Sequence, residues 1–360
     1  MIKNYFFGFS IWKRKHILAF FPKSEKYIFA NSLSNALKHG LNTHDTNIYI
    51  WGKKDFPKVE EYAKSHNISL FRVEDGFVRS VSLGSDLTKA YSLVIDSRGI
   101  YFDPHTPSDL ENILQTYTFD NVMLNRSKQL QEYLIENKIS KYNIDKNKTI
   151  VLQKRQENQT VILVPGQVED DASIIYGANG MTNSELLKEV RKIAPNAYII
   201  YKPHPDVHAG NRVGHIQEHE ATQYCDIVID SVSLDSVVTL ADEIHTMTSL
   251  VGFEALIRGK KVYTYGLPFY AGWGLTTDVK VCQRRSRKLT LDMLVAAALI
   301  LYPRYINPKT NGLCEIEEIS YEIDKEKNRY NTDTLYRLRI QSRNWISRKI
   351  QLLIKVIFSE

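Results

Sequence analysis

The 360-residue chain lacks several features that would assign it to a class directly. It has three cysteines, Cys225, Cys282 and Cys314, without a CxxC pair, so it predicts neither a disulfide framework nor a zinc site. No run approaches the roughly 20 apolar residues of a membrane span. Trp12-Lys-Arg-Lys15 interrupts the apolar N-terminal residues, so no secretory leader is expected. We therefore expect a protein of a reducing, cytoplasmic compartment.

Two common nucleotide-binding motifs are also missing. No GxGxxG follows the first expected strand of either half, and the chain contains no GxxxxGK[ST]. These absences argue against NAD chemistry and against ordinary ATP chemistry. The composition, with 43% hydrophobic and 24% charged residues, is that of a globular chain long enough for two domains.

The net charge of +6 is modest, but positive charge gathers near the C-terminus. Residues 331–360 are predicted to form a basic amphipathic tail, in which basic residues stand among apolar ones. Two interpretations stay open: a helix that touches an anionic membrane surface, or a helix that packs on its own domain. The basic residues of this tail are Arg337, Arg339, Arg343, Arg348, Lys349 and Lys355.

The N-terminal half shows the pattern of an α/β domain. Buried strands are expected at residues 26–31, 47–51 and 69–73. The third is followed by Glu74-Asp-Gly-Phe-Val-Arg-Ser80, which puts two carboxylates at the carboxyl end of a strand, where α/β sheets carry ligands. The same two acids could instead cap a helix or form salt bridges. A polar, basic stretch places the domain boundary near residue 155.

A second α/β unit is expected from Thr160 onwards. The strand at 160–165 leads into the acidic stretch Gly166-Gln-Val-Glu-Asp-Asp-Ala-Ser173, and the strand at 197–202 ends in Lys202-Pro-His-Pro-Asp206. Prolines on both sides of His204 fix its backbone in a stiff loop. A histidine held this way beside a lysine is a better candidate for contacting phosphate or carboxylate than a lone histidine.

Residues 246–275 predict one complete βαβ step. A strand ends at Thr246, Thr248 or Ser249 caps a helix, and Gly259 closes it before a strand at 261–265. The N-terminus of such a helix favours phosphate. Within the helix, Glu254 either binds a ribose diol or is a solvated residue. In the following loop, Phe269, Tyr270 and Trp273 either line the donor site or pack on the loop's own core.

Six segments of the chain together resemble the bacterial capsule polysaccharide biosynthesis family, whose members are retaining β-Kdo glycosyltransferases. The resemblance covers about residues 5–320. The segments are EDGFVRS (74–80), GQVEDDAS (166–173), KPHPD (202–206), HTMTSLVGFEALIRG (245–259), PFYAGWGLT (268–276) and LYPRY (301–305).

The resemblance implies a GT-B-like α/β fold with two Rossmann-like domains facing a cleft. Residues 1–155 would form the acceptor-side domain and residues 156–330 the CMP-sugar-binding domain. The donor would be CMP-β-Kdo, and the acceptor a glycan or a lipid-linked glycan. The family needs no cofactor and no metal, and no nucleic acid is expected as a partner. The protein would lie at the inner membrane as a peripheral protein.

The resemblance also implies roles for individual residues. Asp171 would be a nucleophile that forms a covalent Kdo adduct, and Glu74 would be the acid/base, with Asp75 as its substitute. His204 would lie near the donor phosphate or the sugar carboxylate, and Arg79 would hold a substrate carboxylate. The residues expected to bind the nucleotide or neutralise the departing CMP are Gln167, Lys202, Ser249, Gly252 and Glu254, with Thr248 as a further hydroxyl donor.

Other functions stay open. The donor could be another CMP-activated nonulosonic acid, or the chain could be a non-catalytic module that binds CMP-sugar or glycolipid in an export assembly. The capsule linker enzyme of the family has two modules in tandem and this chain has one. The acceptor could therefore be that of a separate linker transferase or that of a terminating module in O-antigen synthesis.

Overall fold

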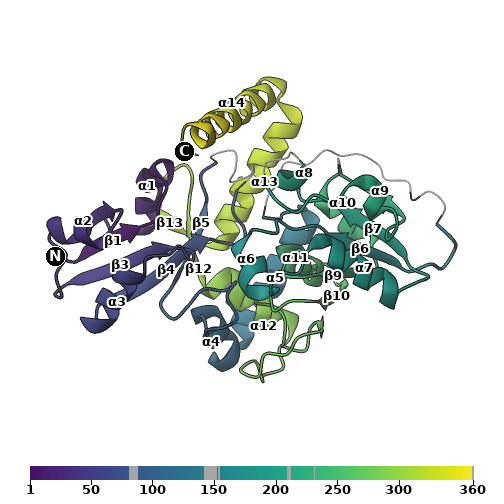
Figure 1. The fold of residues 1–360 in the computed structure, drawn as a ribbon, viewed down its shortest axis with the longest axis horizontal. Helices are drawn as coiled ribbons and strands as arrows, with labels where there is room; N and C mark the ends of the chain where they lie inside the picture. Colours follow the sequence, from purple (N-terminus) through teal and green to yellow (C-terminus); the bar gives the residue numbers. More distant parts are fainter. Residues whose placement is uncertain (81–87, 142–151, 153–154, 209–211, 231, 359–360) are drawn as a thin grey trace. The chain divides into compact units, whose positions relative to one another are not determined.

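The computed structural model describes residues 1–80, 88–141, 152, 155–208, 212–230 and 232–358 (Figure 1). The chain folds into two compact units, which are described separately below. The first contains Met1–Gly99, Glu136–Ile144 and Ala298–Glu360, and the second contains Ile100–Ile135 and Asp145–Ala297. This division differs from the expected boundaries. Residues 100–135 belong to the second unit, and the segment from Ala298 returns to the first.

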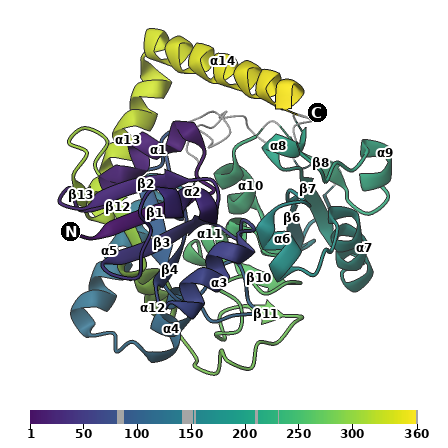
Figure 2. The same cartoon turned by 60° about the vertical axis from the view of Figure 1, so that its left-hand side comes forward.

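The first unit is built on a seven-stranded mixed sheet. Its strands are β1 (Lys3–Phe7), β2 (Lys26–Ala30), β3 (Thr46–Trp51), β4 (Ser69–Asp75), β5 (Ser92–Asp96), β12 (Pro303–Ile306) and β13 (Leu313–Cys314). They lie in the order β13-β12-β5-β4-β3-β1-β2. Figure 2 shows β2, β1, β3 and β4 side by side in this order, and these four are parallel. β5 is antiparallel to both β4 and β12, and β13 is antiparallel to β12.

Both faces of this sheet are buried, which explains why β1 and β3 are apolar at successive positions. Because side chains alternate along a strand, Tyr5 and Ile48 enter one core and Phe6 and Tyr49 enter the other. The rings of Phe6 and Tyr49 stack with centroids 4.9 Å apart. The helices of this unit are α1 (Ile11–Ile17), α2 (Leu33–Lys38), α3 (Pro57–Ser65), α13 (Ile316–Thr332) and α14 (Thr334–Phe358).

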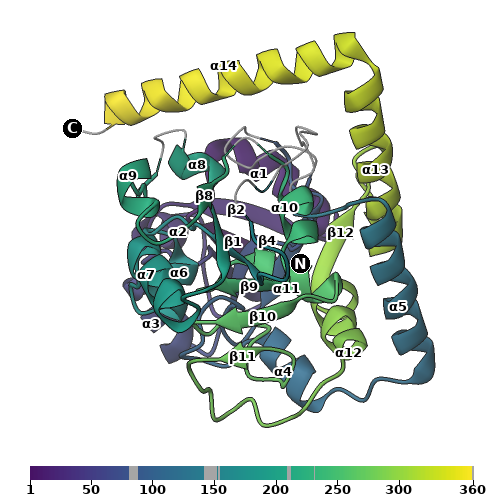
Figure 3. The same ribbon diagram turned by 90° about the vertical axis from the view of Figure 1, so that its right-hand side faces the viewer.

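α14 turns sharply away from α13, as Figure 3 shows. Among the residues that the structure describes, no helix is both long enough and apolar enough to cross a lipid bilayer.

The second unit is built on a six-stranded sheet in which every strand is parallel to its neighbours. Its strands are β6 (Val161–Pro165), β7 (Tyr198–Lys202), β8 (Ile227–Val228), β9 (Glu243–Thr246), β10 (Lys261–Thr264) and β11 (Thr277–Asp278). Its helices are α4 (Asp109–Thr116), most of α5 (Asn121–Glu136), α6 (Ala172–Gly177), α7 (Asn183–Ile193), α8 (Pro205–His208), α9 (Glu218–Ala221), α10 (Leu234–Leu240), α11 (Leu250–Ile257) and α12 (Leu291–Val295).

The strand order of this sheet is β11-β10-β9-β6-β7-β8. From β6 the chain adds strands in one direction, and from β9 it adds them in the other, so the order reverses between β6 and β9. Open α/β sheets bind ligands outside the carboxyl ends of the strands at such a reversal. The expected α/β fold is confirmed, and the sheet of the second unit is parallel and Rossmann-like. The first sheet was also expected to be Rossmann-like, but it is mixed, because β5, β12 and β13 pair antiparallel.

Candidate functional site

The side chain of Gln167 joins the two strands that flank the reversal. It follows β6 and is only 6% exposed. Its Nε2 donates to Thr248 Oγ1 (3.0 Å), and its Oε1 accepts from the backbone N–H of Thr248 (3.0 Å) and from Thr246 Oγ1 (3.2 Å). Because the three bonds go to the last residue of β9 and to the loop that follows it, one amide fixes the two loops relative to each other. The predicted site residue Gln167 is therefore at the reversal, where it contacts protein groups.

The N-terminus of α11 follows this loop directly. Ser249 is its N-cap, and the Ser249 Oγ accepts from the backbone N–H of Val251 at 3.2 Å. The Tyr270 hydroxyl donates to the carbonyl of Ser249. The helix therefore begins at the carboxyl edge of the sheet, with its positive end beside the strand reversal. Glu254 lies further along α11 and is mostly buried.

Gly252 is needed where Tyr270 crosses α11. A Cβ at position 252 would lie 2.3 Å from the Tyr270 hydroxyl oxygen. Tyr270 and Trp273 are fully buried and Phe269 nearly so, and the Trp273 Nε1–H donates to the carbonyl of Phe269 (2.8 Å). These contacts support the interpretation in which the aromatic residues pack on the loop's own core. The contact with Tyr270 is a structural reason for Gly252, and its predicted contact with nucleotide stays a prediction.

The three acidic residues after β6 have different surroundings. Glu169 Oε1 accepts from the backbone N–H of Asn183 (2.7 Å), and Asp170 is paired with Arg212 (2.9 Å). Asp171 is exposed and caps α6, and its Oδ1 accepts from the backbone N–H (2.9 Å) and the hydroxyl (2.8 Å) of Ser173. Asp170 and Asp171 are both exposed, but Asp170 is held in an ion pair, whereas Asp171 is fixed in direction by a helix cap.

Asn183 holds this acidic loop in place, although no sequence motif points to it. Its side chain accepts from the N–H of Gln167 (2.8 Å) and donates to the carbonyls of Gln167 (2.8 Å) and Gly214 (2.9 Å). Asn183 is 1% exposed, and Gly214 has a φ of +119° where a Cβ would meet both Asn183 and Gln167 at 2.8 Å. The residue stands inside an ordinary capping sequence, so no local signal marks its second role.

The loop after β7 packs against the start of the acidic loop. A Cβ on Gly166 would lie 3.3 Å from the backbone nitrogen of His204, so glycine permits this approach. His204 is half-buried, and its Nδ1 accepts from the backbone N–H of Asp206 at 3.2 Å. In the neutral ring the proton is therefore on Nε2. Lys202 is buried, and its ammonium donates to the carbonyl of Val232 at 2.7 Å.

These contacts bring the loops after β6, β7 and β9 together at one edge of the sheet. Asp171 supplies an exposed carboxylate, His204 an N–H donor, and α11 a positive helix end. This combination suits a ligand that carries a phosphate beside an electrophilic carbon.

The other predicted residues form a separate cluster in the first unit. Glu74 and Asp75 end β4, and Asp75 Oδ2 accepts from Arg79 Nε (2.8 Å) and lies 3.6 Å from Lys13 Nζ. The same ammonium lies 3.5 Å from the centre of the Trp51 ring. Asp75 Oδ1 is buried and has no hydrogen-bond partner among the residues that the structure describes.

The two adjacent carboxyls have opposite pKa shifts. Burial, together with the charge of Asp75, raises the pKa of Glu74 to about 7 although Lys13 opposes this. Burial alone would also raise the pKa of Asp75, but the charges of Lys13 and Arg79 outweigh burial and hold this pKa below its usual value. Glu74 is thus able to exchange a proton near neutral pH, whereas Asp75 stays ionised.

Arg79 is 1% exposed, which bears on its predicted contact with substrate. Its guanidinium donates to Asp75, to Ser80 Oγ (2.9 Å) and to the carbonyl of Thr88 (3.0 Å). The structure therefore shows Arg79 holding Asp75 in place. Its contact with a substrate carboxylate stays a prediction.

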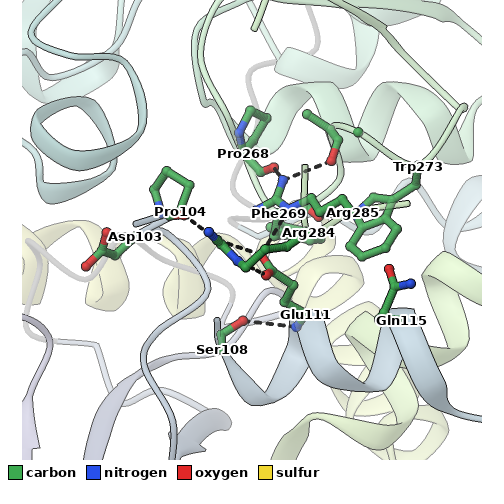
Figure 4. A network of polar contacts seen from close by, with 12 residues as sticks. Asp103, Pro104, Ser108, Glu111, Gln115, Pro268, Phe269, Trp273, Arg284 and Arg285 are labelled. Atoms are coloured by element: carbon green, nitrogen blue, oxygen red, sulfur yellow. Dashed lines mark hydrogen bonds and ion pairs between the residues drawn. The ribbon is translucent and has the colours of Figure 1, made fainter. Parts of the chain in front are cut away.

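A buried ion network supports the loop that covers α11 (Figure 4). Glu111 of α4 accepts from Arg284 Nε (2.7 Å) and from Arg285 Nε (3.1 Å). Arg285 also donates to the carbonyls of Pro268 (2.6 Å) and Ala271 (2.9 Å). The loop is thus fixed through Arg285 at one point and through Tyr270 on Ser249 at another.

Comparison with known proteins assigns the family. The family model described as capsule polysaccharide biosynthesis protein matches residues 46–305. The chain belongs to this family. It is 47% identical over 335 residues to the capsule polysaccharide modification protein LipA of Neisseria meningitidis, covering 92% of this chain and 47% of LipA. It is 37% identical over 327 residues to the lipopolysaccharide-processing protein LpsZ of Rhizobium meliloti, covering 89% and 74%. The chain thus spans about half the length of LipA.

Two solved structures are similar to this member of the family. One is Thermosulfurimonas dismutans KpsC described as a beta Kdo 2,7 transferase, with a TM-score of 0.73 and 37% identity over 90% of this chain and 99% of that one. The other is KpsC of the same organism described as a beta Kdo 2,4 transferase, with a TM-score of 0.76 and 30% identity over 89% and 97%.

The role of Gln167 can be tested with Gln167→Leu. Leucine leaves the Thr248 N–H and both threonine hydroxyls without their amide partner, so we expect a loss of roughly 1–3 kcal/mol in the free energy of unfolding. Urea denaturation measures this loss. Gln223→Leu, at an exposed position, is the control and should change stability by less than about 0.5 kcal/mol. Equal effects of the two substitutions would contradict the bridging role.

The buried ion network can be tested with Arg285→Met. We expect a loss of about 3 kcal/mol, because the substitution breaks a buried pair and leaves the carbonyls of the loop without their donor. Arg284→Met is the matched control, since Arg284 binds the same carboxylate but its side chain is 41% exposed. It should cost about 1 kcal/mol or less. Thermal unfolding compares the two, and a larger loss for Arg284→Met would show that the exposed pair is the important one.

The raised pKa of Glu74 predicts a pH dependence of stability. In the folded state the Glu74 carboxyl keeps its proton up to about pH 7, whereas in the unfolded state it releases the proton near pH 4.5. The contribution of Glu74 to the free energy of unfolding therefore falls as pH rises from 4.5 to 7. Glu74→Gln should remove this fall, and Glu61→Gln, at an exposed position of α3, should keep it. Denaturation curves between pH 4.5 and 8 measure the effect. The same slope in wild type and Glu74→Gln would rule out the shift.

Proposed function

We propose that this chain is a retaining β-Kdo glycosyltransferase that transfers Kdo from CMP-β-Kdo to a glycan or glycolipid in capsule or other surface polysaccharide biosynthesis. The observation that supports this most strongly is the likeness to two solved β-Kdo transferases across about nine tenths of the chain. The strand reversal with its capped helix and exposed carboxylate supplies groups suited to a sugar nucleotide.

In this proposal the second unit binds the donor. The N-terminus of α11, with Ser249 and Thr248, receives the phosphate, and Glu254 receives the ribose. His204 donates its Nε2–H to the phosphate or to the sugar carboxylate, which favours departure of CMP. Lys202 adds positive charge near the leaving group from its place at the end of β7.

The reaction proceeds by two displacements. A carboxylate oxygen of Asp171 bonds to C2 of Kdo while the bond from C2 to the phosphate oxygen breaks, and CMP leaves with the electron pair. An acceptor hydroxyl then bonds to C2 and the ester to Asp171 breaks, so the configuration at C2 is retained. Glu74 takes the hydroxyl proton, for which a pKa of about 7 is suitable. Asp75, which Lys13 and Arg79 keep ionised, is the weaker candidate for that proton transfer.

The test is intact-protein mass spectrometry after incubation with CMP-Kdo generated in situ. We expect wild type to gain the mass of one Kdo and Asp171→Ala to gain none. Asp170→Ala is the matched control, because Asp170 is the adjacent exposed carboxylate and is paired with Arg212. The Asp170→Ala variant should still form the adduct, and it should release CMP at no less than about a tenth of the wild-type rate.

Three results would overturn all or part of the proposal. CMP release that survives Asp171→Ala would move the nucleophile elsewhere or exclude double displacement. An adduct formed with another CMP-activated nonulosonic acid, and none with CMP-Kdo, would change the donor. If the protein releases no CMP from CMP-Kdo, either without an acceptor or with a Kdo-terminated glycan, a binding-only module is the better description.

A further inference from the structure

The helix α14 presents different residues on its two faces. On one face Ile340 and Asn344 are buried, with exposures of 8% and 9%. Tyr336 donates to Glu326 of α13 (2.9 Å), and Arg343 donates to Thr88 Oγ1 (3.2 Å). These contacts fix the orientation of the helix, so the opposite face is held outward.

That opposite face carries large apolar side chains. Leu335 is 80% exposed, Leu338 52%, Trp345 62% and Ile346 50%. Their spacing of three, seven and one residues places all four within about a third of the helix circumference. We call these four residues the α14 stripe. Exposing four large apolar side chains together is costly in water and marks an interaction surface.

The charge of α14 identifies what this surface contacts. Residues 334–358 contain six basic residues and no aspartate or glutamate. Lys349 lies 5.8 Å from the Trp345 ring centre, and Arg339 is exposed beside the stripe. An apolar stripe with tryptophan, flanked by charge of a single sign, is typical of helices that lie in the interface of an anionic membrane. A second copy would bring the same positive charge against this face and be repelled.

We propose that α14 docks the protein on an anionic lipid surface, with the α14 stripe inserted among the acyl chains and Arg339 and Lys349 against the headgroups. Both open interpretations of the C-terminal tail then apply, each to one face of the helix. The side with Ile340 packs on the protein, and the α14 stripe binds lipid. This inference does not depend on the identity of the sugar donor.

The experiment is co-sedimentation of the full chain with vesicles. We expect binding to phosphatidylcholine vesicles that contain about 30% phosphatidylglycerol, little binding to pure phosphatidylcholine, and weaker binding at high salt. The stripe variant Leu338→Ser/Trp345→Ser and the charge variant Arg339→Glu/Lys349→Glu should each bind at least roughly tenfold more weakly.

Matched controls separate the helix from general surface effects. Ile193→Ser/Val281→Ser removes two apolar side chains that are 52% and 82% exposed elsewhere, and Lys58→Glu/Lys64→Glu makes the same change in net charge on α3. Both should bind vesicles like wild type. All four variants should have the thermal unfolding midpoint of wild type and should release CMP at the wild-type rate with a water-soluble acceptor. A failure of the transferase reaction is therefore distinguishable from a failure of docking.

Three results would overturn the docking proposal. The first is that wild type does not bind the anionic vesicles. The second is that the stripe variant binds them as well as wild type. The third is that the stripe variant changes the oligomeric mass in solution without changing vesicle binding, which would make a second copy of the chain the occupant of the stripe.

Discussion

The buried amide of Gln167 is the contact on which the arrangement of the second unit depends. At a strand reversal the two central strands separate into different crossovers, and nothing in the sheet ladder fixes the loops that follow them. A glutamine suits this place because its planar end both donates and accepts, and here it satisfies Thr246 and Thr248 together. Since the amide is buried, its bonds are made to protein and the two loops act as one rigid edge.

Further contacts extend this rigidity in two directions. On one side, Asn183 holds the acidic loop through the backbone of Gln167 and the side chain of Glu169, two residues before Asp171. On the other side, Tyr270 holds the first turn of α11 and is itself held by the loop that Arg285 anchors. The exposed carboxylate and the helix N-terminus are thus two ends of one connected set of buried polar contacts. Such a set pre-organises a site before a ligand arrives.

Much of the fold could be predicted from local sequence, and the misses have a common cause. The strands β2, β3, β4, β6, β7, β9 and β10 lie where apolar runs and caps indicate them, because those signals are local. The strand β1, which lies second from one edge of its sheet, is not predicted, since its short aromatic run stands out only as part of the interrupted apolar N-terminus. The return of β12 to the first sheet depends on pairing with β5 about 200 residues earlier, and the pair of Glu111 with Arg285 spans a similar distance. Periodicity carries no information about such partners.

The adjacent carboxyls at the end of β4 show how structure distinguishes residues that sequence makes equivalent. Successive side chains of a strand point to opposite faces, so neighbours in sequence have different neighbours in space. Asp75 faces the cations of Lys13 and Arg79, and Glu74 is half-buried with weaker compensation. One carboxyl is therefore held as an anion while the other keeps its proton to near neutral pH. The negative charge on Asp75 also contributes to the raised pKa of Glu74. Because Lys13 and Arg79 keep Asp75 ionised, these two cations help to set the pKa of Glu74 as well.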